Sequence, residues 1–245
     1  MGNEEREELE KKIEQEMMVR FGEMMQERMV TEQRQKAANF RTLNRLVKKG
    51  GILFTGSSLM EMFSVSEMAV SAGIRTPVYN RGIGGTTTED FLREIDAVLL
   101  GVQPKAVFIN IGTNDMTDRV YGSAWMEHLL SNYEAIIRTG TEKLPGTVFY
   151  CMAYYPTNQH LPGQEIWAKE MLKERTKENI RLCCEGVERI AKKYGQRYID
   201  VNEGLYDENG EQKKEFAIDG VHMIAEAYAI VFQNLLPYLR ELDEQ

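Results

Sequence analysis

Five short apolar runs alternate with longer amphipathic stretches from about residue 48 to the end of the chain. The runs have the composition of buried strands and cover residues 52–55, 77–79, 106–111, 147–152 and 197–201. Between and after them, apolar residues at helical spacing predict helices over 59–71, 88–100, 124–142, 164–194 and 224–242. Strands that alternate with helices form parallel βαβ units. We therefore predict an α/β fold, a three-layer α/β/α sandwich around a five-stranded parallel sheet.

Residues 1–48 show a different pattern, in which apolar side chains recur about every four residues in a highly charged segment. The stripe consists of Leu9, Ile13, Met17, Phe21, Met25 and Met29, widened by Met18 and Met24. This spacing predicts an N-terminal amphipathic helical extension before a single domain over 49–245. An unbroken helix here would reach ~65 Å, more than the width of a small domain. The helix therefore either breaks near Gly22 or Thr31 or projects from the body.

An apolar stripe of this size needs a surface to cover it. In one interpretation, the helix packs on its own domain. In the other, it contacts a second copy of the chain in a homodimer, where flexible methionine side chains suit an adaptable interface.

The composition argues against several classes of protein. A net charge of −8 without any block of Lys and Arg disfavours nucleic acid as a partner. Three cysteines, two of them adjacent, make neither a disulfide framework nor a zinc site, and they predict a cytoplasmic protein. The acidic first residues lack the apolar segment of a signal peptide, and the longest apolar runs have only strand length. We therefore expect no stable membrane insertion.

Polar, glycine-rich segments follow four of the five predicted strands. They read GSS at 56–58, NRGIGGT at 80–86, GTND at 112–115 and, after a longer loop, DGVH at 219–222. In an open parallel sheet, ligands bind at the carboxyl ends of the strands. The four segments are therefore expected to meet at one edge of the sheet and to form the functional site.

Familiar glycine motifs do not fit these segments. Segment 51–58 has Ser57 where a P-loop has its phosphate-binding Lys, and segment 82–87 lacks the third glycine of a dinucleotide fingerprint. Met60 replaces the last glycine of the nucleophile elbow of α/β-hydrolases. We therefore expect no nucleotide cofactor.

The sequence contains only three histidines, His128, His160 and His222. His222 follows Asp219 by three residues, a spacing at which a carboxylate in a tight turn can reach the Nδ1–H of the histidine. The Nε2 atom would then be free to act as a base for a serine such as Ser58. The alternative is a helix-capping Asp beside an exposed His, and convergence with the serine and asparagine loops favours the catalytic interpretation.

Four segments resemble, in order and spacing, the motif blocks of the SGNH or GDSL-type hydrolases. They are the nucleophile block FTGSSL at 54–59, the glycine block NRGIGG at 80–85, the asparagine block IGTND at 111–115 and the DGVH block at 219–222. The resemblance covers about residues 50–242. The glycine block is most similar to the platelet-activating-factor-acetylhydrolase-like branch, whose members cleave short acyl esters.

This resemblance implies a flavodoxin-like fold and a serine esterase that acts on small acyl esters without a cofactor or metal. It implies that Ser58 is the nucleophile and that Asp219 and His222 complete the triad. It further implies an oxyanion hole made by the backbone N–H groups of Ser58 and Gly85 and the side-chain amide of Asn114.

Several points stay open at this level. Ser57 stands where the family has an acidic residue, so Ser57 is an alternative nucleophile. Tyr154, Tyr155 and His160 follow the fourth predicted strand and are candidates for substrate binding. Carbohydrate O-acetylesterase, lysophospholipase, thioesterase and acyltransferase activities occur in the same family. A protein of another class, a non-catalytic scaffold that oligomerises through the N-terminal helix, is the remaining alternative.

Overall fold

The computed structural model describes residues 3–163 and 166–244. In this part of the chain, five parallel strands form one sheet in the order β2-β1-β3-β4-β5. The strands are β1 (Ile52–Gly56), β2 (Val78–Asn80), β3 (Ala106–Asn110), β4 (Val148–Met152) and β5 (Arg197–Ile199). Each of them corresponds to one predicted run, and the strand order is that of flavodoxin-like folds. The predicted parallel sheet is therefore confirmed.

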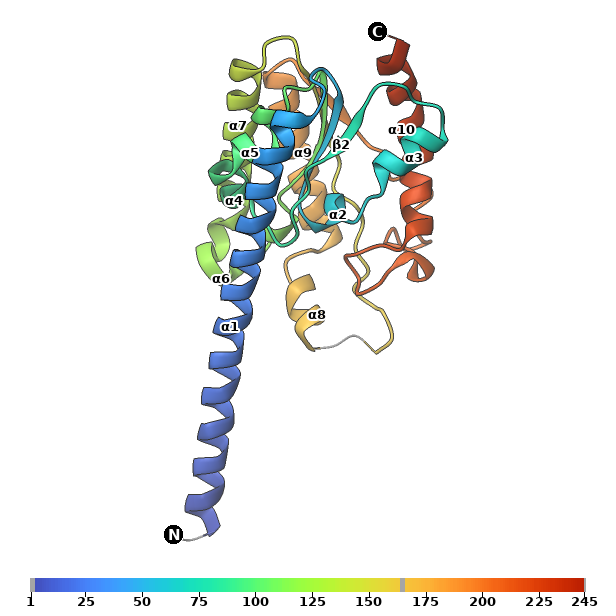
Figure 1. Ribbon diagram of the computed structural model, residues 1–245. Helices are drawn as coiled ribbons and strands as arrows, with labels where there is room; N and C mark the ends of the chain where they lie inside the picture. The colour runs from blue at the N-terminus through green and yellow to red at the C-terminus, as the bar shows by residue number, and fades with distance from the viewer. Residues whose placement is uncertain (1–2, 164–165, 245) are drawn as a thin grey trace.

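Helices cover both faces of this sheet, as Figure 1 shows. Because successive side chains of a strand point to opposite faces, Ile52 and Phe54 pack in one core cluster and Leu53 in the other. The first cluster includes residues of α3 (Val65–Ser71) and α10 (Ala225–Glu244). The second includes residues of α4 (Thr88–Arg93), α5 (Ile95–Val98), α7 (Trp125–Lys143) and α9 (Lys177–Lys193). The three-layer sandwich is thus confirmed.

Several predicted helices are interrupted by short turns. The range 59–71 contains α2 (Ser58–Glu61) and α3, and 88–100 contains α4, α5 and the start of a 3-10 helix η1 (Leu100–Val102). The range 164–194 contains α8 (Ile166–Leu172) and α9, separated where the Thr176 hydroxyl accepts a hydrogen bond from the backbone N–H of Asn179. A single helix over 164–194 was therefore a wrong prediction, because Thr176 starts a new helix. The remaining short elements are η2 (Thr113–Asp115), α6 (Asp118–Tyr121), η3 (Gly122–Ala124) and η4 (Lys214–Phe216).

The N-terminal helix α1 (Asn3–Leu46) runs for 44 residues without a break. Its C-terminal part packs on α5 and η1, where Ala37 is fully buried and Asn44 Nδ2 donates a hydrogen bond to the carbonyl of Ala97 over 2.8 Å. The rest projects well beyond the body (Figure 1). Of the two alternatives for this helix, projection is correct and a break is not.

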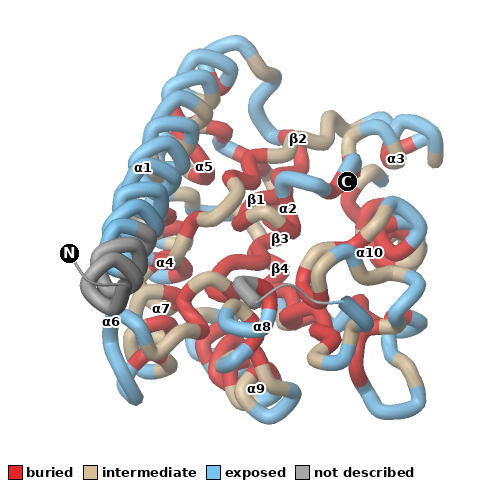
Figure 2. Tube along the Cα trace, turned by 90° about the horizontal axis from the view of Figure 1, so that it is seen from below, coloured by how far each residue is buried: buried red, intermediate tan, exposed pale blue. Residues whose placement is uncertain are grey.

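The apolar stripe of α1 is not covered by its own domain. The exposed fractions of Ile13, Met17, Phe21 and Met25 lie between 46% and 65%. Figure 2 shows the same helix as exposed over most of its described length, at the margin of a buried sheet. Packing of this stripe on its own domain was therefore a wrong interpretation, while the side chain of Leu9 lies outside the described residues. None of the helices in the described ranges is long and apolar enough to cross a bilayer.

Candidate active site

Ser58 lies at the carboxyl end of β1, beside the point where the strand order reverses between β1 and β3. Strand β1 ends at Gly56, whose φ of +154° and close approach to β3 exclude a side chain, since a Cβ there would lie 1.9 Å from the carbonyl oxygen of Asn110. The chain then turns sharply, and Ser58 is the first residue of α2. Ser58 Oγ lies 2.8 Å from His222 Nε2, whereas Ser57 is almost completely buried. It is therefore Ser58, and not Ser57, that meets the histidine.

His222 is oriented by a tight turn that begins at Asp219. One carboxylate oxygen of Asp219 accepts hydrogen bonds from the backbone N–H groups of Val221 (2.9 Å) and His222 (2.8 Å). The other oxygen lies 2.6 Å from His222 Nδ1. Because an ionised carboxylate only accepts hydrogen bonds, Nδ1 carries the proton and Nε2 presents its lone pair to Ser58. The spacing of three residues therefore produces the geometry that the sequence predicted.

Asp219 stays ionised in this environment. Its burial raises the pKa, but the hydrogen bonds from the His222 ring and from the two backbone N–H groups outweigh burial and lower the pKa to about 2. A second segment supports the same turn, since the Asn158 N–H donates to the carbonyl of Gly220 over 2.8 Å. The turn is thus held both from within and by the loop that follows β4.

The glycine segment after β2 lies directly beside Ser58. The Asn80 side chain donates to the carbonyls of Met60 (2.6 Å) and Phe63 (3.0 Å) and accepts from the Gly82 N–H (2.8 Å). These bonds fasten the segment to α2. A Cβ placed on Gly84 would lie only 3.7 Å from the Cβ of Ser58. The two segments therefore meet, although the connection between β1 and β2 separates them in the sequence.

Asn114 completes this group of donors after β3. One N–H of its amide donates to the carbonyl of Thr86 over 2.9 Å, which leaves the second N–H of the same nitrogen. Within residues 3–163 and 166–244, the backbone N–H groups of Ser58 and Gly85 have no protein acceptor. Within the described residues, the segments that follow β1, β2 and β3 therefore each carry an N–H group without a protein acceptor, on Ser58, Gly85 and Asn114.

Arg175 orients the Asn114 amide, and the sequence analysis did not identify it. Its Nε donates to the carbonyl of Thr113 (2.9 Å) and its Nη2 to Asn114 Oδ1 (3.2 Å). Arg175 is only 5% exposed, and burial lowers its pKa to about 10, so it stays protonated at neutral pH. No sequence signal could have found this residue, because it falls inside a stretch predicted as continuous helix.

The predicted substrate-binding residues lie in different places. Tyr154 and Tyr155 are buried, and Tyr154 Oη donates to the carbonyl of Ile111 over 2.8 Å. Tyr155 packs in the core cluster on the α10 face of the sheet. His160 is exposed, and its Nδ1 lies 3.0 Å from Glu211 Oε2. These contacts assign core packing to the two tyrosines, and contact with a substrate stays a prediction for all three residues.

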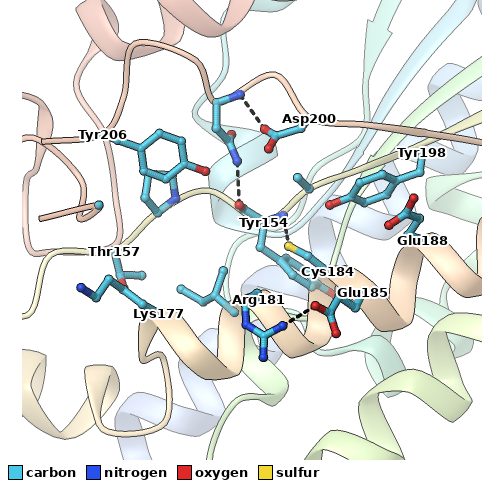
Figure 3. Close-up of a pocket in the computed structure, with 15 residues that line it drawn as sticks. Tyr154, Thr157, Lys177, Arg181, Cys184, Glu185, Glu188, Tyr198, Asp200 and Tyr206 are labelled. Carbon is cyan, nitrogen blue, oxygen red and sulfur yellow. Dashed lines mark hydrogen bonds and ion pairs between the residues drawn. The ribbon is translucent and has the colours of Figure 1, made fainter. Parts of the chain in front are cut away.

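Tyr154 also lines a cavity of about 330 Å³ between α9 and the loops after β4 and β5, shown in Figure 3. Its wall combines charged and aromatic side chains, including Lys177, Arg181, Glu188 and Tyr206. Within the described residues, this cavity has no wall contributed by Ser58 or His222. It is therefore a separate hollow from the site at the end of β1.

A buried carboxylate next to Asn114 also has a structural explanation. Asp115 accepts hydrogen bonds from the backbone N–H (2.9 Å) and the hydroxyl of Thr88, at the start of α4. Burial raises its pKa to about 6, more than these hydrogen bonds lower it. In the described part of the chain, no group of three His, Cys, Asp or Glu side chains is arranged to hold a metal ion. That the protein uses no metal stays a prediction.

Comparison with known proteins identifies similar sequences and folds. The model of the GDSL-like lipase/acylhydrolase family matches residues 65–230, a region that includes Asp219 and His222 and begins after Ser58. A solved structure from Streptococcus pneumonia, presented as a candidate platelet activating factor, is 28% identical, with a TM-score of 0.79 and coverage of 90% of this chain and 99% of that one. Comparison with curated proteins gives no match.

Two further structures share the fold at lower identity. A GDSL-like lipase from Bacteroides thetaiotaomicron is 18% identical, with a TM-score of 0.67 and coverage of 84% of this chain and 97% of that one. An acetyl-xylooligosaccharide esterase from Geobacillus Stearmophilus is 18% identical, with a TM-score of 0.58 and coverage of 79% and 96%. At this identity the likeness concerns the fold alone.

Proposed function

The chain belongs to the GDSL-like lipase/acylhydrolase family and is a hydrolase that acts on ester bonds, and from this premise we propose that it is a serine esterase for small acyl esters. Ser58 is the nucleophile, His222 the general base and Asp219 the residue that orients the histidine. The observation that carries the proposal is the hydrogen-bonded series Ser58 Oγ, His222 Nε2, His222 Nδ1 and Asp219 Oδ2, with separations of 2.8 and 2.6 Å.

The first half of the reaction transfers the acyl group to the enzyme. Ser58 Oγ attacks the ester carbonyl carbon while its proton moves to His222 Nε2, and the carbonyl oxygen becomes an oxyanion. Asp219, ionised because its pKa is about 2, stabilises the imidazolium that forms. The C–O bond to the alcohol then breaks, and His222 gives its proton to the departing alkoxide oxygen, which leaves the acyl group on Ser58.

The second half releases the acid. Water attacks the acyl carbon, His222 takes the water proton, and the oxyanion forms again at the same position. Collapse of this intermediate returns the proton to Ser58 Oγ and frees the carboxylic acid. In both halves, the N–H groups of Ser58 and Gly85 and the free N–H of Asn114 stabilise the oxyanion. Removal of one such donor typically lowers kcat by a factor of ~10²–10³.

A small acyl group, acetyl or another short chain, is favoured by the glycine block NRGIGG, which resembles that of the platelet-activating-factor-acetylhydrolase-like branch. A series of p-nitrophenyl esters from acetate to palmitate tests this. We expect kcat/KM to be highest for the shortest chains and to vanish in Ser58→Ala. A maximum at long chains would instead indicate a lysophospholipase or thioesterase, and activity confined to acetylated sugars would indicate a carbohydrate O-acetylesterase. Complete inactivity, with Ser58 unlabelled by a fluorophosphonate probe, would contradict the esterase and favour a scaffold.

We also propose that a second copy of the chain covers the exposed stripe of α1 in a homodimer. The stripe exposes Ile13, Met17, Phe21 and Met25 to solvent, and burying an apolar side chain of this size stabilises the protein by about 1.5–3 kcal/mol.

We expect a small-molecule ester, and not a nucleic acid, as the partner of the site. A cytoplasmic location and a domain boundary near residue 48 stay predictions.

A further inference from the structure

The peptide between Gly84 and Gly85 is held by α1, a helix outside the motif blocks. Gln33 Nε2 donates a hydrogen bond to the carbonyl oxygen of Gly84 over 2.9 Å. We propose that Gln33 is a positioning residue for ester hydrolysis, one that fixes the Gly85 N–H in the direction of the oxyanion. This inference rests on the proposed function, in which the Gly85 N–H is an oxyanion donor.

The geometry of the peptide unit connects the two groups. In a planar trans peptide, the C=O of one residue and the N–H of the next point in opposite directions. A donor that holds the Gly84 carbonyl on one side therefore fixes the Gly85 N–H on the other. A hydrogen bond accepted by the carbonyl also polarises the same peptide and makes its N–H a better donor.

Glycine allows many backbone conformations, so the direction of the Gly84–Gly85 peptide depends on the hydrogen bonds that hold it. Gly82 and Ile83 are anchored by Asn80 Oδ1 and by the carbonyl of Gly56, over 2.8 and 3.0 Å. Neither of these two bonds involves the Gly84–Gly85 peptide, which carries the Gly85 N–H. Gly85 itself has a φ of +73°, and a Cβ there would lie 2.9 Å from Met29 Sδ of α1. Thr86 closes this turn, since its hydroxyl donates to the carbonyl of Ile83 over 2.7 Å, and helix α1 covers the Gly84–Gly85 peptide within the turn.

A second contact from the same helix holds the other side of Gly84. The Gly84 N–H donates to Glu61 Oε2 over 2.6 Å, and Glu61 Oε1 pairs with Lys36 Nζ at 2.5 Å. Lys36 lies one helical turn after Gln33, so both side chains leave the same face of α1. Both polar groups of Gly84 are thus tied, directly or through Glu61, to one rigid helix.

The helix is in turn fixed to the glycine block by a buried arginine. Arg81 Nε donates to Asn44 Oδ1 over 3.0 Å, and its guanidinium lies over the Phe40 ring. Arg81 is 5% exposed, so this contact is part of the core. Gln33 therefore projects from a helix with a defined position. A residue that orients a backbone group needs such a fixed position.

Gln33→Glu tests the proposal, because it removes the N–H donor and keeps the shape, and Gln33→Met removes it without adding charge. The matched controls are Gln35→Glu and Gln35→Met, at an exposed position on the same helix. We expect kcat to fall about tenfold in both Gln33 variants with little change in KM, a smaller loss than removal of a whole donor. The inhibition constant of a trifluoromethyl ketone, which forms a tetrahedral oxyanion with the serine, should rise by a similar factor. The Gln35 variants should match the wild type.

Three other results separate the possible failures. Suppose that Asn114→Ala has a lowered kcat, while the Gln33 variants match the Gln35 controls in kcat and in the inhibition constant of the ketone. The positioning role of Gln33 is then wrong, and the proposed esterase function is retained. If the Gln33 variants raise KM and leave kcat unchanged, Gln33 acts on ground-state binding and the inference is overturned. If the wild-type protein cleaves no ester and the probe leaves Ser58 unlabelled, both proposals fall together.

Discussion

Ser58 Oγ and His222 Nε2 lie within hydrogen-bond distance, 2.8 Å, although 164 residues separate the two side chains in the sequence. Ser58 is placed by the turn after β1, and His222 by the turn that leads into α10. The turn after β1 lies at the carboxyl edge of the sheet, and the long loop that follows β5 brings His222 back to this edge.

Substitution of the nucleophile should remove ester hydrolysis. Ser58→Ala deletes the hydroxyl that meets His222, and loss of a serine nucleophile typically lowers kcat by ~10⁶. Ser57→Ala is the matched control, since its side chain is buried next to the same turn. Initial rates with p-nitrophenyl acetate measure both variants. Near-normal turnover by Ser58→Ala together with an inactive Ser57→Ala would show that Ser57, and not Ser58, is the nucleophile.

Asn114→Ala should reduce kcat by about 10²–10³ and leave KM nearly unchanged. The reason is that an oxyanion exists only near the transition state, so its donor contributes little to binding of the intact ester. Saturation kinetics separate the two constants. A large increase in KM with normal kcat would make Asn114 a contact for the substrate ground state.

Arg175→Lys should lower kcat through Asn114. A lysine ammonium cannot reproduce the two directed hydrogen bonds that the guanidinium makes to Thr113 and Asn114. We expect a loss of about tenfold, with Arg189→Lys on the exposed surface as the control. In a double-mutant cycle with Asn114→Ala, the two losses should not add, because both act on one donor. Fully additive losses would show that Arg175 acts elsewhere.

The stability of the protein in acid should carry a contribution from Asp219. Its pKa is about 2 in the folded protein and near the ordinary 3.8 when unfolded, so the carboxylate stabilises the fold above pH 3.8. This stabilisation, about 2 kcal/mol, is lost as the pH falls from 3.8 to 2. Denaturant unfolding of the wild type and of Asp219→Asn at pH 5 and at pH 2 measures it. We expect a smaller decrease in the variant, and equal decreases would contradict the pairing with His222.

Charges on the α1 stripe should separate the proposed homodimer. Met17→Lys combined with Phe21→Lys places two ammonium groups where a second copy would pack, so the protein should run as a monomer with unchanged esterase activity. Gln15→Lys with Gln26→Lys adds the same charge at polar positions of the helix outside the stripe and serves as control. Light scattering gives the mass of each. A wild-type protein that is already monomeric would overturn the homodimer.

Local patterns were sufficient for the layout of the fold. The five apolar runs predicted the five strands, and the signal is clearest in the central strand β3 (AVFIN), since a strand covered on both faces must be apolar almost throughout. The helix boundaries at 62–64 and 173–176 were missed. The second boundary depends on a side-chain acceptor, since the backbone N–H of Asn179 donates to the Thr176 hydroxyl. A periodicity of apolar residues contains no information about that choice.

The candidate site divides in the same way. The sequence alone predicted the proposed reacting groups and their pairing, because the Asp219 carboxylate accepts hydrogen bonds from His222 only three residues away and because parallel strands end at one edge of the sheet. Only the tertiary structure decided what holds those groups in place. Gln33 on α1 and Arg175 in the connection between α8 and α9 reach Gly84 and Asn114 across 51 and 61 residues, through side chains whose direction depends on how these segments dock. Such contacts leave no periodic signal, since one long polar side chain on a helix looks the same in the sequence whether it faces solvent or a catalytic loop.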